Sequence, residues 1–170
     1  MSHCKNKVDW CLNKAKKELQ EGKKHRGLIK INPETKLIEA HIKKAEHNLN
    51  AIQDFKKIGY SDWSASAGFY SIYHCFLAIC IKFGYESRNQ ECTFALIHYL
   101  IETGQINLDA EVVNKIQSIN PEESQEHPLI IDIRESEQYG VSLSLNEISF
   151  ERLLITAKTI LDKTKEIIQS

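Results

Sequence analysis

The sequence predicts an all-α fold, an antiparallel up-and-down bundle of about five to six helices. Residues 62–83 are apolar nearly all round, which a helix sustains only where neighbouring helices cover most of its surface. Residues 33–58 instead carry an apolar seam at alternating spacings of four and three, typical of a long helix with one buried face. The seam consists of Ile38, Ile42, Ala45, Leu49 and Ile52. Strand-like alternation is weak along the whole chain, so no stable sheet is expected.

The N-terminal part is predicted to be an extension, residues 1–32, ahead of a bundle that occupies residues 33–170. A short amphipathic helix is expected over residues 8–21, with lysines on its outer face, and Gly22 ends it. The basic linker Gly22–Asn32 follows. Pro33 can open the long helix, because the first turn of a helix has no partner for the N–H that proline lacks.

Turn and cap residues indicate where the other helices begin and end. Gly59 is predicted to end the long helix, Ser61 to cap the central helix and Gly84 to end it. The later helices are predicted over residues 92–101, about 108–119 and about 149–168. A loop of about twelve residues, 122–133, precedes the last helix, and its length is typical of a functional or mobile segment.

Composition limits the classes of function. The chain has 170 residues, of which 22 are basic and 23 acidic, so it suits one domain and has no global positive charge for nucleic acid. Any RNA-binding surface is expected as a local patch. The N-terminus lacks the apolar core of a signal peptide, and Trp63–Phe83 contains too many polar groups for a membrane span. We expect a cytoplasmic protein with reduced thiols, in which Cys75 and Cys80 are core residues.

Four segments resemble the HEPN family, small helical domains linked to nucleotide and RNA handling. Trp63–Ile81, WSASAGFYSIYHCFLAICI, is similar to the central HEPN helix, in which an aromatic pair and a histidine lead into an apolar stretch. Three others resemble the opening helix, the connection after the central helix and the Arg-centred signature before the last helix. They are Lys44–Leu49 (KAEHNL), Phe83–His98 (FGYESRNQECTFALIH) and Arg134–Gly140 (RESEQYG). The likeness spans roughly Glu34–Ile168.

The resemblance implies a partner and a chemistry. It implies a homodimer, nucleotide or RNA as ligand without a cofactor, and a neighbouring minimal nucleotidyltransferase as a toxin–antitoxin partner. The ribonuclease members use an arginine followed after four to six residues by a histidine, and two such motifs meet across the dimer. Here Arg134 is followed after four residues by Tyr139, whose phenol, with an ordinary pKa near 10, is a poor general base at pH 7. The sequence therefore predicts an inefficient ribonuclease at best.

Arg134 and Tyr139 are the first candidates for a nucleotide or RNA site. The guanidinium of Arg134 suits two phosphate oxygens, and the alternative is a structural ion pair with a neighbour such as Glu135 or Glu137. Tyr139 either stacks on a base or packs on the final helix. His74, on the central helix, is a third candidate, with a hydrogen-bonded core histidine as the alternative.

Arg88 and Asn89 stand just ahead of a predicted helix, where backbone N–H groups can hold an anion. Helix capping and solvation are the alternative role for both residues. The basic linker either contacts a phosphate backbone or is simply solvated. No metal site is expected, because the histidines and cysteines near the N-terminus fit no established ligand spacing. These residues are His3, Cys4, Cys11 and His25.

Three functions remain open from sequence. The preferred one is a nucleotide- or RNA-associated HEPN protein in which binding depends on Arg134, with Tyr139 and His74 nearby. The second is a weak ribonuclease in which Arg134 stabilises transition-state charge. The third is a non-catalytic helical adaptor that binds a partner protein through an apolar surface.

Overall fold

A computed structural model describes residues 3–117, 141 and 143–170 of the protein. This part of the chain forms six helices and one small two-stranded sheet. The helices are α1 (His3–Gln20), α2 (Thr35–Lys57), α3 (Ser61–Lys82), α4 (Gln90–Glu102), α5 (Ala110–Gln117) and α7 (Glu147–Gln169), and the strands are β1 (Leu28–Lys30) and β2 (Tyr85–Ser87). The predicted all-α bundle is confirmed, and the predicted helix ends differ from these by no more than about five residues.

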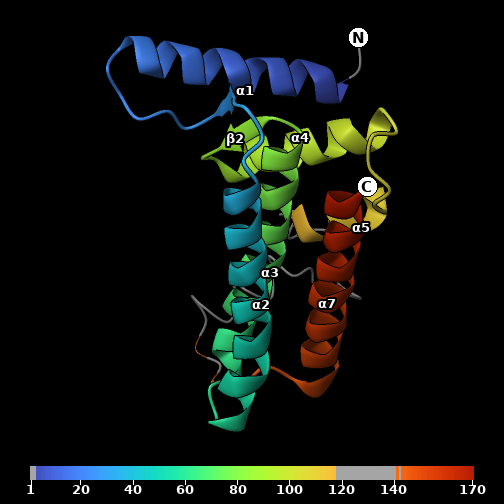
Figure 1. The fold of residues 1–170 in the computed structure, drawn as a ribbon. Coiled ribbons are helices and arrows are strands. Elements are labelled where there is room, and N and C mark those ends of the chain that lie inside the picture. The colour runs from blue at the N-terminus through green and yellow to red at the C-terminus, as the bar shows by residue number, and fades with distance from the viewer. Residues whose placement is uncertain (1–2, 118–140, 142) are drawn as a thin grey trace.

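Three long helices, α2, α3 and α7, lie side by side, with α2 antiparallel to the other two (Figure 1). Two contacts mark the ends of the α3–α7 pair. Near its start, Ser61 Oγ accepts a hydrogen bond of 2.9 Å from the backbone N–H of Leu145, and near its end Lys82 Nζ donates to the Ile168 carbonyl at 3.1 Å. The prediction that Ser61 caps α3 is wrong, because Tyr60 is the N-cap and the Ser61 hydroxyl instead fixes the approach to α7.

Helix α3 forms the centre of the core. Helices α2, α4 and α7 contact it, and most of its side chains are buried, including Phe69, Phe76 and Ile79. Two buried serines on α3 donate to carbonyls of α2, Ser64 to Ile52 at 2.7 Å and Ser71 at 2.9 Å to Ala45. Among the described residues α3 is the one helix long and apolar enough to cross a membrane, but 72% of that window is buried inside the fold. It therefore has the character of a core helix.

Helix α3 approaches α7 closely at Gly68. A Cβ atom added to Gly68 would lie 2.4 Å from Leu153 Cδ1 and 2.7 Å from Leu153 Cγ. Leu153 is fully buried and cannot move aside into solvent. The absence of a side chain at this position therefore sets the spacing of the two helices.

We expect Gly68→Ala to lower the free energy of unfolding by about 1–3 kcal/mol, because the added methyl group overpacks the α3–α7 contact. At an exposed helix position the same change would stabilise the protein by about 1 kcal/mol, because alanine favours a helix more than glycine does. A fall in the free energy of unfolding would therefore reveal the overpacking. Chemical denaturation of Gly68→Ala, Leu153→Ala and the double variant measures the coupling. A stabilised Gly68→Ala protein, or additive effects in the double variant, would contradict the close contact.

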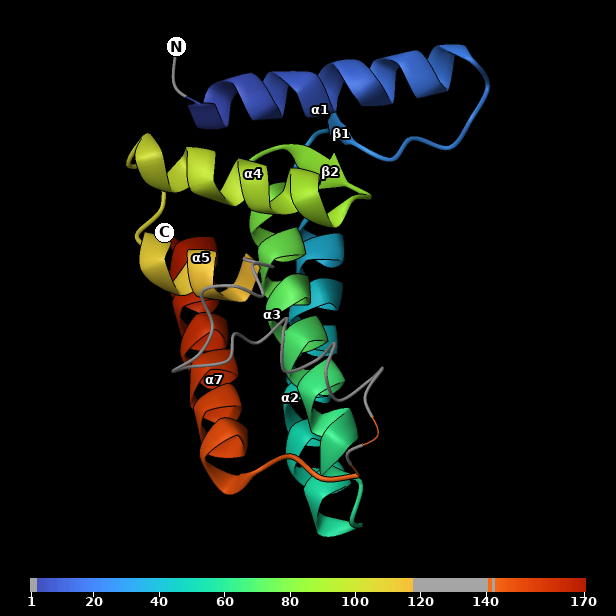
Figure 2. The same ribbon diagram turned by 180° about the vertical axis from the view of Figure 1, so that it is seen from behind.

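Helices α1 and α4 lie across the end of the bundle at which α3 ends (Figures 1 and 2). Near its end the basic linker forms strand β1. This strand pairs antiparallel with β2, which lies in the connection between α3 and α4. The expectation that no sheet forms is wrong here. Gly27, just before β1, lies so close to α1 that a Cβ atom would be 2.3 Å from the Cys11 carbonyl oxygen. The linker is thus held between α1 and the connection after α3.

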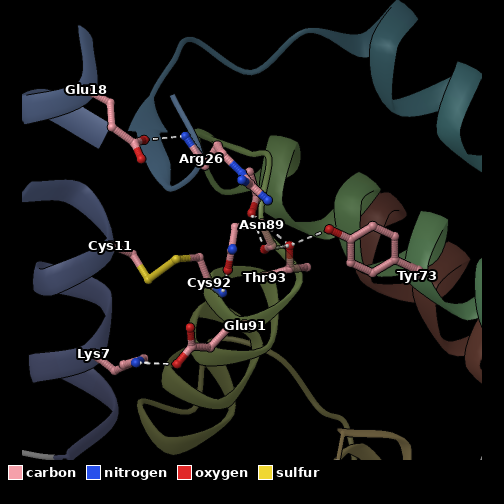
Figure 3. The surroundings of a disulfide bond; sticks show 10 residues. Lys7, Cys11, Glu18, Arg26, Tyr73, Asn89, Glu91, Cys92 and Thr93 are labelled. Carbon is pink, nitrogen blue, oxygen red and sulfur yellow. Dashed lines mark hydrogen bonds and ion pairs between the residues drawn. A yellow bond between two sulfur atoms is a disulfide. The ribbon is translucent and has the colours of Figure 1, made fainter. Parts of the chain in front are cut away.

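A disulfide joins α1 to α4 through Cys11 and Cys92, which are 81 residues apart and both fully buried (Figure 3). The expectation of reduced thiols is therefore wrong for this pair, and Cys11 is not available as a metal ligand. Cys4, Cys75 and Cys80 are free thiols. Cys75 and Cys80 are buried core residues as predicted, and burial raises the pKa of each thiol to about 12.

We expect Cys92→Ala to lower the free energy of unfolding by about 2–5 kcal/mol under oxidising conditions, because the disulfide closes a long loop in the unfolded chain. Denaturation of the unmodified protein and the variant, with and without reductant, measures the effect. Thiol titration of the unmodified protein, unfolded under non-reducing conditions, should give three thiols. Equal stability of the two oxidised proteins, or five titratable thiols in the unmodified chain, would exclude the bond.

Candidate functional site

A groove of about 320 Å³ runs along the surface between α2 and α3. Two rows of side chains line it, one from each helix, at the spacings of a single helix face. From α2 come Lys44, His47, Asn48, Ala51 and Phe55, and from α3 come Trp63, Ser66, Ala67, Tyr70 and His74. No acidic residue is among these ten, so the groove suits an anionic or neutral ligand.

Two aromatic rings form the α3 side of the groove. Trp63 is 52% exposed and Tyr70 is 48% exposed, although they lie on the most buried helix of the protein. They are seven residues apart, two turns of helix, and therefore share the one face of α3 that α2 and α7 leave open. An exposed indole and an exposed phenol on one face are suitable surfaces for the stacking of a nucleic-acid base.

The α2 side supplies the polar groups. Lys44 and His47 are exposed, and Asn48, which is partly buried, lines the groove beside them. The ammonium group of Lys44 is the fixed positive charge among the lining residues. A ligand with a flat ring and a phosphate would thus meet aromatic surface on α3 and a cation on α2.

His74 ends the groove, where it contacts His41 of α2. The two Nδ1 atoms are 2.9 Å apart, so one ring donates its N–H and the other accepts through a lone pair. Burial lowers the pKa of His41, and burial, reinforced by the charges of His41 and Lys44, lowers the pKa of His74 to about 4. Both imidazoles are therefore neutral at pH 7, which the shared hydrogen bond requires.

A second hollow, of about 280 Å³, lies on the other side of this histidine pair. It is lined by Leu37, His41, Leu77, Ile81, Glu86, Ser87 and Arg88. His41 borders this hollow and contacts His74, which borders the groove, so the histidine pair separates the two cavities. Of the predicted site residues, His74 thus lines the groove and Arg88 lines the second hollow.

The other predicted residues have local roles or lie outside the described part. Arg88 donates through Nε to Glu86, and Asn89 caps α4 by accepting a hydrogen bond of 2.9 Å from the Cys92 N–H (Figure 3). Arg134 and Tyr139 lie outside the described residues, so their predicted role in ligand binding stays a prediction. Within the described part no group of three histidine, cysteine, aspartate or glutamate residues could hold a metal ion.

Of the residues that line the groove, sequence reasoning proposed only His74 as a site residue, and it missed the α2 side entirely. Lys44 and Asn48 flank the apolar seam of the long helix, and His41 lies one turn before them. Their i, i+3 and i+7 spacing puts them on one face, which was a usable signal. This face borders Trp63 because of the way α2 packs against α3. The spacing of residues along α2 does not determine that packing.

The fold and the groove define a small helical bundle with an aromatic and basic site between α2 and α3. The HEPN domain model matches residues 38–168, most of the chain. The protein belongs to the HEPN domain family, which supports a nucleotide- or RNA-associated function at the level of the family. A comparison with curated proteins gives no significant match.

The histidine pair makes stability depend on pH. Because the folded pKa of His74 is depressed to about 4, below the ordinary 6.5, its contribution is complete above pH 6.5 and is lost as pH falls towards 4. We expect His74→Asn, which keeps hydrogen-bonding groups without titrating, to flatten the decline in unfolding free energy over this range. Denaturant titrations at several pH values between pH 8 and pH 4 measure how steeply the free energy of unfolding changes with pH. The comparison concerns this slope and not the free energy at any one pH. An equally steep decline in both proteins would contradict the partly buried, neutral histidine pair.

Proposed function

We propose that this HEPN protein binds nucleotides or RNA in the groove between α2 and α3. The observation that supports the proposal is the pairing of exposed aromatic rings, Trp63 and Tyr70, with the cation of Lys44 in a groove without acidic residues. A base stacks on the aromatic side, and a phosphate lies against Lys44. Base stacking on an aromatic side chain contributes about 1–3 kcal/mol, enough for weak but saturable binding when one ion pair is added.

The neutral His74 serves recognition in this proposal. A general acid or base is most efficient when its pKa lies near the working pH, and the pKa of His74 is lowered to about 4. A neutral imidazole can still donate to or accept from a base edge. Binding is thus better supported than cleavage, and a ribonuclease activity would need the Arg134 segment to supply the chemistry.

The partners of the protein are part of the same proposal. From the resemblance to HEPN proteins we propose a homodimer and, beside it, a minimal nucleotidyltransferase in a toxin–antitoxin pair. Arg134 and Tyr139, which lie outside the described residues, stay candidates for contact with the same ligand. Light scattering of the purified chain, alone and mixed with a co-expressed nucleotidyltransferase, tests both associations: a monomer at micromolar concentration that binds no such enzyme would reject them.

We expect Lys44→Gln and Trp63→Ala each to weaken binding of a labelled single-stranded RNA by about fivefold or more at low salt, because each removes one half of the site. Fluorescence anisotropy measures the dissociation constant. Lys43→Gln is the matched control, since Lys43 is the adjacent exposed lysine but lines a different hollow beside α7. Equal losses in the Lys43 and Lys44 variants would mean that only general charge matters.

Arg134→Ala separates the groove from the predicted Arg134 site. Binding that falls in this variant and in Lys44→Gln indicates one surface to which both residues contribute. Binding that depends on Lys44 but not on Arg134 limits the site to α2 and α3. If neither variant changes the dissociation constant, the proposed function is wrong.

A further inference from the structure

Helix α1, which lies ahead of the matched family region, has a polar stripe with an exposed tryptophan at its centre. The stripe consists of Asn6, Trp10, Asn13 and Lys17, spaced by four, three and four residues and all exposed. Trp10 is 46% exposed. The opposite face of α1 holds Val8, Cys11 and Ala15, which are buried. The stripe therefore faces away from the bundle.

Positive charge gathers around the Trp10 ring. Lys7 Nζ lies 4.3 Å and Lys14 Nζ 5.2 Å from the ring centroid. The helix has five lysines and two acidic residues, and both acidic residues have partners. Asp9 pairs with Lys5 at 2.7 Å, and Glu18 accepts from the backbone N–H of Arg26.

Two lysines on or beside the stripe, Lys14 and Lys17, can contact an anionic ligand. Lys7 forms an ion pair with Glu91 of α4, but Lys14 and Lys17 have no acidic partner within the described residues. Lys14 thus lies beside the exposed indole ring, and Lys17 follows on the same stripe, two turns of helix beyond Trp10. Because the net charge of the whole chain is −1, this face is a local excess and not a reflection of overall composition.

The position of this face is fixed with respect to the bundle. The Cys11–Cys92 disulfide and the Lys7–Glu91 ion pair attach the helix to α4 (Figure 3). The close contact of Gly27 with the α1 backbone adds a third attachment along the same face of the helix. Figures 1 and 2 place α1 across one end of the bundle, whereas the groove begins at Trp63 near the other end of α3. The stripe and the groove are therefore separate surfaces.

The chemistry of the stripe favours a flexible polyanion with flat rings over an anionic membrane. A membrane-binding helix needs a continuous apolar face opposite its basic face. The two exposed apolar side chains of α1, Trp10 and Leu19, are nine residues apart and lie on opposite sides of the helix. A single aromatic ring between amides and lysines instead matches the stacking and phosphate contacts of single-stranded nucleic acid.

We propose that the stripe on α1 is a second contact site for single-stranded RNA, which stacks a base on Trp10 and places the flanking phosphates against Lys14 and Lys17. In the complex the base takes the place of the Lys14 ammonium group over the Trp10 ring, and that ammonium group contacts a phosphate instead. The amides of Asn6 and Asn13 lie on either side of Trp10 and can bond to base edges or ribose. The choice of RNA rests on the proposed function, but the site does not need the groove.

The two tryptophans of the chain allow each site to be observed alone. In a Trp63→Phe protein the indole fluorescence comes from Trp10, and in a Trp10→Phe protein it comes from Trp63. Titration of each full-length protein with oligouridylate reports stacking at one site by quenching. Quenching of Trp10 but not of Trp63 supports the α1 site and rejects the groove, and the reverse result overturns the α1 site.

Charge variants test the phosphate contacts. Lys14→Gln combined with Lys17→Gln should weaken RNA binding in the Trp63→Phe protein and lower the slope of log affinity against log salt by about 1.4, since each phosphate contact on a single strand contributes about 0.7. Lys16→Gln is the matched control, because Lys16 is adjacent to Lys17 but lies on another side of α1.

Trp10→Ala should cost about fivefold to 100-fold in affinity at the α1 site, and Trp10→Phe should keep most of it. Circular dichroism and thiol counting confirm that the helix and the disulfide persist in each variant. An unchanged dissociation constant for Trp10→Ala, equal effects of the Lys16 and Lys17 changes, or binding of anionic phosphatidylserine vesicles without binding of RNA would overturn the proposal.

Discussion

The packing of α3 against α2 and α7 is the constraint on which the rest of the structure depends. A helix that is apolar nearly all round cannot remain exposed, and α3 is covered because Gly68 lets α7 approach and because Ser64 and Ser71 satisfy their hydroxyls on α2. Since α2 and α3 are fixed to each other by these contacts, the two rows of residues on their shared outer face have a fixed spacing. The position of the groove is therefore determined by the packing of the core.

The exposed aromatic side chains of α3 contribute only part of their surface to this packing. Phe69, Phe76 and Ile79 fill the interior, whereas Trp63 and Tyr70 remain about half exposed on the one open face. A large ring left in water gives up much of the free energy that its burial would contribute, about 1.5–3 kcal/mol for a large apolar side chain. Two such rings beside Lys44, with His74 held neutral by burial, are the features on which the proposed ligand surface depends.

Local sequence patterns were sufficient to predict the helices but not their long-range contacts. The seam from Ile38 to Ile52 and the apolar segment of α3 determine the bundle, because each depends on the period of a single helix. The pairing of β1 with β2 and the Cys11–Cys92 disulfide join segments far apart in the chain, so spacing could not reveal them. The His41–His74 contact was missed for the same reason, although His74 itself was predicted.

The N-terminal extension is integral to the folded end of the bundle, because a disulfide across 81 residues and a strand pair both attach it. A helix attached only by a flexible linker would hold Trp10 in no fixed place, and binding would lose free energy to ordering it. The disulfide removes that cost before any ligand arrives. RNA binding on a nearly neutral chain has to come from local patches. Under the two proposals, a strand that contacts both patches would gain avidity from the second contact.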